Sequence, residues 1–180
     1  MCSSDLAALT DAWIQLRQTP AEQRRVALVL ANYPTRNSRL ANGVGLDTPA
    51  STAAMLQWLQ EAGYDLGDAS PPPDGEALIA LLLAGRSNDP ESEHRPPLAH
   101  LPLPAYERWY RQLPEPGRQR LEAVWGAPAS DAGLERHTPA SAEAGTTGGG
   151  ERAGLGFPVR GLRFGRVVVL IQPERGYDRD

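Results

Sequence analysis

The sequence predicts an α/β fold, with a small, mostly parallel sheet flanked by helices and a long low-complexity loop. Two apolar runs, residues 25–31 and 166–171, are too short for helices and are bounded by polar residues, as buried parallel strands are. Segments with helical spacing and capping signals lie between these runs. The 180 residues suffice for one domain with a hydrophobic core.

The chain should begin with an amphipathic helix over residues 5–18. Its large apolar side chains recur at helical spacing, so we expect them to pack in the core. They are Leu6, Leu9, Trp13 and Leu16. The strand at 25–31 follows this helix.

A second helix should begin at Thr48 or Pro49, because Asp47 or Thr48 can cap it and proline favours its first turn. Gly63 should end it. We expect residues 64–66 to form a short second strand, so that residues 25–66 make a right-handed, parallel βαβ unit.

The middle of the chain predicts a proline-rich connector at 68–74 and a third helix at 76–84, capped by Asp74. The run ALIALLLA in this helix is apolar nearly all round, which predicts burial in the core; the alternative is a surface for another domain. Residues 86–104 read as a polar, proline-rich loop, followed by short helices at 105–113 and 117–125.

The last third should begin with a flexible surface loop. Residues 126–156 are rich in Ala, Gly, Ser, Thr and Glu, a composition that buries little apolar area. Residues 159–164 alternate polar and apolar side chains and should pair at a sheet edge. Residues 166–171, RVVVLI, give the strongest strand signal in the chain.

Polar residues follow both strong strands, at 32–47 and at 172–175. If the strands are parallel neighbours, both loops lie on one edge of the sheet, where open α/β sheets bind ligands. The alternative is that these side chains stabilise their own loops through local turns. The candidate binding residues are Asn32, Tyr33, Arg36, Arg39, Asn42, Asp47, Gln172 and Arg175.

Several classes of function are disfavoured. A net charge of -4 and a pI of about 5.4 argue against a nucleic-acid partner, and neither a membrane span nor a secretory signal is visible. The Gly43-Val44-Gly45 segment matches neither a Walker A loop nor a complete dinucleotide fingerprint. His94, His100 and His137 lack metal-ligand spacing, so we assign no catalytic residue and no metal ligand.

Three phrases carry a family resemblance: VALVLANYP, RLANGVGLDTPAS and RGLRFGRVVVLIQPERGYD. They resemble the large subunit of aerobic cobaltochelatase, the CobN-type relatives of the large magnesium chelatase subunit. The likeness covers roughly residues 6–178, with a diverged middle. Because that subunit is far longer, the resemblance implies a fragment from its amino-terminal side. The fragment would comprise a leading helix (1–20), a βαβ unit with helices (25–125), the loop (126–156) and returning strands (157–177).

The resemblance implies a cytoplasmic, ATP-dependent enzyme that inserts cobalt, as substrate, into hydrogenobyrinic acid a,c-diamide during cobalamin biosynthesis. ATP would be hydrolysed by an AAA-type partner subunit acting with a companion subunit, and the fragment alone would be inactive and hold no cofactor firmly. The corrinoid would meet Tyr33 on its face and the Arg and amide side chains at its rim. The alternatives are a porphyrin-binding magnesium chelatase subunit and a non-catalytic docking lobe for the ATPase partners.

Overall fold

A computed structural model describes residues 3–32, 40–41, 45–127, 134–136 and 154–173. The chain divides into two compact units, one formed by residues 1–96 and 160–180 and the other by residues 97–159. The first unit therefore joins segments from both ends of the sequence. The predicted segment 25–125 extends across both units.

The first unit is built on a three-stranded sheet with the order β1-β6-β5. β1 (Val26–Leu30) pairs in parallel with β6 (Val167–Ile171), and β5 (Gly161–Phe164) pairs with β6 in the antiparallel direction. Both strong strand predictions and the edge strand are thus confirmed, as is the α/β class. This sheet is less parallel than predicted, because one of its two pairings is antiparallel.

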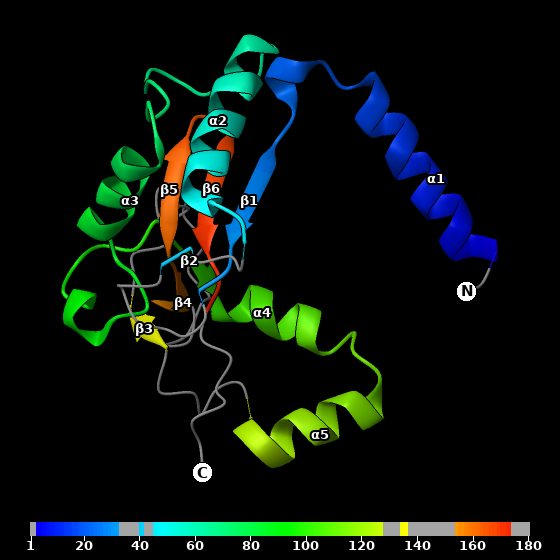
Figure 1. Cartoon of the computed structure of the whole chain (residues 1–180). Coiled ribbons are helices and arrows are strands. Elements are labelled where there is room, and N and C mark those ends of the chain that lie inside the picture. The colour runs from blue at the N-terminus through cyan, green and yellow to red at the C-terminus, as the bar shows by residue number, and fades with distance from the viewer. Residues whose placement is uncertain (1–2, 33–39, 42–44, 128–133, 137–153, 174–180) are drawn as a thin grey trace. The chain divides into compact units, whose positions relative to one another are not determined.

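Two helices, α2 (Thr48–Glu61) and α3 (Gly75–Ala84), pack against one face of this sheet (Figure 1). Alternate residues of β6 are buried, and Val29 on the opposite face of β1 is 60% exposed. Asp47 caps α2 and Asp74 caps α3, as predicted. The core cluster comprises Leu30, Leu40, Ala41, Leu56, Leu66, Leu78, Leu82, Phe164, Val167, Val169 and Ile171.

Residues 64–66 are not a strand, so the predicted βαβ unit over 25–66 is wrong. The parallel neighbour of β1 is β6, which lies far along the sequence. The segment instead turns beside the β5–β6 hairpin, where the Arg166 amide donates to the Asp65 carbonyl oxygen at 2.9 Å. Asp65 Oδ1 accepts from the Gly67 amide at 2.9 Å, and Leu66 is buried in the core. A turn can bury one leucine without any strand pairing, which is why the apolar Leu66 wrongly indicated a strand.

The leading helix α1 (Ser3–Gln18) forms as predicted, but its apolar stripe is not buried. Trp13 is 69% exposed and Leu16 is 59% exposed. The expectation that this stripe packs in the core is therefore wrong for the described part of the chain. A short 3-10 helix, η1 (Ala21–Gln23), leads from α1 toward β1.

The second unit combines a small antiparallel sheet with two helices, α4 (Leu103–Tyr110) and α5 (Glu115–Trp125). Its sheet has the order β2-β4-β3, formed by β2 (Ala99–Pro102), β4 (Leu155–Val159) and β3 (Glu135–Arg136). The Tyr106 ring packs edge-on against Phe157, with 5.0 Å between ring centroids. Both helices match the sequence prediction to within a few residues.

Two loop predictions are corrected by this sheet. The predicted loop at 86–104 contains β2 and a short 3-10 helix, η3 (Pro90–Ser92). The predicted loop at 126–156 contributes β3 and the start of β4. Backbone pairing needs no particular side-chain composition, so a low-complexity sequence can still supply short strands. Residues 128–133 and 137–153 of that loop lie outside the described residues.

None of the described helices is long and apolar enough to span a bilayer.

Candidate functional site

The candidate site lies at the carboxyl edge of the two parallel strands. Leu30 is in register with Ile171, and the Gln172 amide donates to the Leu30 carbonyl oxygen at 2.9 Å. The polar residues after each strand, Asn32 and Gln172, therefore lie at the same edge of the sheet. This confirms the arrangement on which the predicted site depends.

A third segment, residues 86–92 after α3, joins the same edge. Asn88 Nδ2 donates to the Gln172 carbonyl oxygen at 2.8 Å, which links this segment to the end of β6. Asn88 is itself held in a compact turn, because Ser92 Oγ accepts from the Ser87 amide at 3.0 Å and donates to the Asp89 carbonyl oxygen at 2.7 Å. Arg86, Ser87, Asn88 and Ser92 are all buried.

Sequence reasoning missed this third segment. The run Ser-Asn-Asp-Pro offered a signal, since Asp before Pro commonly caps a turn, and Asp89 Oδ1 does accept from the Glu91 amide at 3.0 Å. Local sequence gives no reason, however, for Asn88 to reach the end of a strand 84 residues away.

Two buried amide oxygens mark this edge chemically. Asn32 is 5% exposed and Asn88 is 7% exposed. Within the described part of the chain, Oδ1 of each is shielded from solvent and has no hydrogen-bond partner. Leaving such an acceptor unpaired costs about 1–3 kcal/mol. Both atoms therefore have unused acceptor capacity at this edge.

The predicted site residues divide into three groups. Asn32 and Gln172 meet at the strand edge, as described above. Asp47 is exposed, and its described contact is the cap of α2, where Oδ1 accepts from the Ala50 amide at 2.9 Å. The others lie outside the described residues: Tyr33, Arg36, Arg39, Asn42 and Arg175.

The described residues do not form a metal centre. They contain no group of three or more His, Cys, Asp or Glu side chains placed to hold an ion. His94 is exposed, and His100 Nε2 lies 3.6 Å from Glu135 Oε2 in the second unit. His137 lies outside the described residues. Among the described residues at the strand edge, Asn32, Asn88 and Gln172 carry neutral amides, and Arg86 adds a buried cation.

Comparison with known proteins gives one consistent family. The family model described as CobN/Magnesium Chelatase matches residues 3–180. The aerobic cobaltochelatase subunit CobN of Pseudomonas aeruginosa is 41% identical over 97% of this chain. The CobN subunit from a Sinorhizobium species is 36% identical over 97% of the chain. The H-type magnesium-chelatase protein of Chlorobaculum parvum is 29% identical, also over 97%.

A solved structure agrees with these sequence relatives. The catalytic subunit of cobaltochelatase from Mycobacterium tuberculosis superposes with a TM-score of 0.67 and 31% identity, covering 91% of this chain. The present chain spans about 12% of the length of that structure and of each of the three curated relatives.

Proposed function

This chain belongs to the CobN/magnesium chelatase family, and we propose on that basis that it forms part of the corrin-binding subunit of a cobaltochelatase. The complete subunit would hold hydrogenobyrinic acid a,c-diamide while Co²⁺, the second substrate, enters the ring on the route to cobalamin. ATP would be hydrolysed by an AAA-type partner with its companion subunit, in the cytoplasm. We assign the whole reaction to the complete subunit, because this chain spans 12% of such relatives.

The cobalt branch is favoured over the magnesium branch by the degree of identity. The two CobN subunits are 41% and 36% identical to this chain, whereas the H-type magnesium-chelatase protein is 29% identical over the same share. A corrinoid is therefore the proposed ring, and protoporphyrin is the alternative.

The observation that carries the proposed ring site is the amide-lined strand edge. Asn32 and Asn88 offer carbonyl acceptors that are already desolvated, and a hydrogen bond to them would remove an existing cost. The rim of a corrin precursor bears amide arms, which can donate such bonds, and carboxylate arms, which arginine binds well. We propose that Arg36, Arg39 and Arg175 meet the carboxylates and that Tyr33 lies against the ring face.

The proposed role of this edge is to position the ring. Metal insertion requires removal of the ring N–H protons, and a base with a suitable pKa must accept them. Asn32, Asn88 and Gln172 carry amide side chains, which neither take up nor release protons near neutral pH. These residues can orient a ring and contribute to its affinity, and the proton transfers belong to other groups of the subunit.

The test is a calorimetric titration of this chain and of the complete subunit with hydrogenobyrinic acid a,c-diamide and with protoporphyrin. The proposal predicts binding of the corrinoid and weaker binding when Arg36 and Arg39 are both replaced by alanine. Arg120→Ala, on exposed α5, is the matched control. Preference for protoporphyrin would assign the magnesium branch. Binding of neither ring, with the ATPase partners still bound, would indicate a docking lobe.

A further inference from the structure

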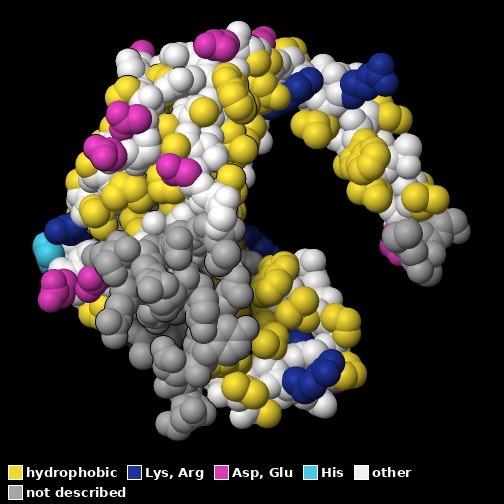
Figure 2. Space-filling view, in the orientation of Figure 1, with side chains coloured by type: hydrophobic (Ala, Val, Ile, Leu, Met, Phe, Trp, Pro, Cys, Tyr) yellow, Lys and Arg dark blue, Asp and Glu magenta, His cyan; other side chains and the backbone are white. Residues whose placement is uncertain are grey.

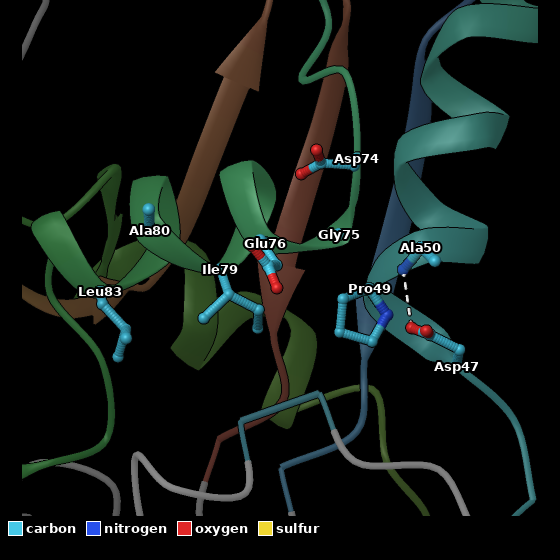
Figure 3. Close-up of a pocket in the computed structure, with 9 residues that line it drawn as sticks. All are labelled: Asp47, Pro49, Ala50, Asp74, Gly75, Glu76, Ile79, Ala80 and Leu83. Carbon is cyan, nitrogen blue, oxygen red and sulfur yellow. Dashed lines mark hydrogen bonds between the residues drawn. The ribbon is translucent and has the colours of Figure 1, made fainter.

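A groove lies beside the amino ends of α2 and α3 and has a volume of about 720 Å³. Figure 3 shows Pro49 at the start of α2 opposite Glu76 and Ile79 on α3. The floor is aliphatic, formed by Pro49, Ile79, Ala80 and Leu83. None of the described amides at the strand edge lines this groove, although Asp47, one of the sequence-predicted binding residues, borders it.

The groove is set by a close backbone contact between the two helices. A Cβ atom built on Gly75 would lie 2.6 Å from the Ala50 nitrogen, so only glycine permits this spacing. Each helix is capped at the same place, since Asp47 accepts from the Ala50 amide and Asp74 accepts from the Ala77 amide. The groove is therefore formed by the fold itself and needs no ligand to open it.

The rim of the groove is acidic, and a cation, Arg95, donates to the backbone oxygens of Leu83 and Gly85 at the carboxyl end of α3. Asp47, Asp74 and Glu76 border the groove, and all three are exposed. The segment 40–85, which contains both helices, has no Arg, Lys or His, although the whole chain has 18 basic residues. Figure 2 shows acidic side chains spread among hydrophobic ones over this face. The six acids of the segment are Asp47, Glu61, Asp65, Asp68, Asp74 and Glu76.

This combination restricts the occupant. Carboxylates around the groove repel phosphate groups, which disfavours nucleic acids and anionic lipid surfaces. They also repel the same face of a second copy. The chain's own exposed helix α1 is a poor occupant, because its two acids, Asp5 and Asp11, outnumber its one base, Arg17. A partner must offer positive charge together with an apolar side chain for the floor.

We propose that this groove docks a basic, amphipathic helical segment of a partner protein. An apolar side chain of that segment enters the aliphatic floor, where burial supplies most of the affinity. Arg or Lys residues beside it meet Asp47, Asp74 and Glu76, and this charge complementarity speeds association and selects the partner. The inference does not depend on which tetrapyrrole the family member binds.

The experiment titrates the full chain with a synthetic helical peptide that has leucine on one face and arginine on the other. Ala80→Arg places a cation in the groove at an exposed position with no core role, and it should weaken binding about tenfold or more. Gln60→Arg adds the same charge to an exposed site of α2 outside the groove and should retain affinity. Glu76→Gln should weaken binding about twofold to fivefold and reduce its salt dependence.

Other outcomes would overturn the inference. Equal losses in Ala80→Arg and Gln60→Arg would indicate non-specific attraction to an acidic protein. Equal binding of a peptide with glutamate in place of arginine would remove the role of charge. Absence of peptide binding would show that no helix docks here. Binding of spermine, a polyamine, without binding of the peptide would lead to the same conclusion. Circular dichroism of each variant establishes that the helices remain folded.

Discussion

Asn32 is a residue at which a cost to the fold can be separated from the proposed binding role. It is 5% exposed, and its Oδ1 has no partner among the described residues. An apolar group of similar shape would remove the unsatisfied acceptor, and such replacements are often neutral or stabilising. A residue kept for binding should therefore show opposite effects on stability and on affinity.

The first prediction uses this contrast. Asn32→Leu should leave the free energy of unfolding unchanged or raise it by about 1 kcal/mol, while weakening corrinoid binding about tenfold. Asn88→Leu should weaken binding and also lower stability by about 1 kcal/mol, because Asn88 Nδ2 donates to the Gln172 carbonyl oxygen. Urea denaturation and calorimetry measure the two quantities. A stability loss in Asn32→Leu without an affinity loss would make Asn32 a structural residue.

Gly75 gives a second prediction at this scale. Alanine usually stabilises a helix relative to glycine, but a Cβ at Gly75 would lie 2.6 Å from the Ala50 nitrogen. Gly75→Ala should therefore lower stability by about 1–3 kcal/mol. A Cβ at Gly117, in α5, would meet no atom within 4 Å, so Gly117→Ala should raise stability by about 0.5–1 kcal/mol. Hydrogen exchange in α3 measures the stability change in Gly75→Ala, and exchange in α5 measures the change in Gly117→Ala. Stability changes of the same sign and size in both variants would refute the close helix contact at Gly75.

At the scale of elements, the sequence predicted what local chemistry determines. The caps Asp47 and Asp74 and the β-branched run of β6 all form as predicted. Side chains that find their partners far along the chain were beyond local reasoning. Leu66 supplied an apolar signal without a strand, and Asn88 joined the site through a contact with Gln172.

Helix α1 shows the limit of pattern alone. Its apolar spacing predicted a helix correctly but also predicted burial, whereas Trp13 is 69% exposed. Trp13→Ala should consequently change the free energy of unfolding by less than about 0.5 kcal/mol. Leu56→Ala on α2, where the side chain is 0% exposed, should cost about 2–5 kcal/mol. A loss of comparable size at Trp13 in urea denaturation would mean that α1 packs in the core.

In the second unit, α4 and α5 are joined through a tyrosine with a shifted pKa. Burial raises the pKa of Tyr110 above its ordinary value of 10.0, and the hydrogen bond to Glu122 Oε1, 3.1 Å away, adds to the effect. The folded unit thus holds the phenol proton more tightly than the unfolded chain does. The stability from this group is fully present below pH 10 and is lost as pH rises through the higher pKa of the folded state.

The corresponding prediction concerns alkaline pH. The wild-type second unit should lose stability above pH 10, and Tyr110→Phe should remove much of that loss because phenylalanine does not titrate. Hydrogen exchange in α4 and α5 across this pH range measures the effect. An unchanged alkaline transition in Tyr110→Phe would show that other groups control it.

At the scale of the whole molecule, the first unit brings distant segments of the sequence together. Residues 30–32, 86–92 and 172 meet at one sheet edge through the parallel pairing of β1 and β6. The sequence predicted that pairing, and with it the meeting of Asn32 and Gln172. It could not predict the second unit's sheet, because Glu135 and Arg136 pair with β4 through backbone groups that every residue carries.

Hydrogen exchange of the complete subunit, with and without hydrogenobyrinic acid a,c-diamide, tests the location of the ring site most directly. If the amides at this edge hold the ring, exchange should slow in peptides covering residues 30–32, 86–92 and 172–173. Peptides from α5 should be unchanged. Saturation with the ring and no protection in those three segments would place the ring elsewhere.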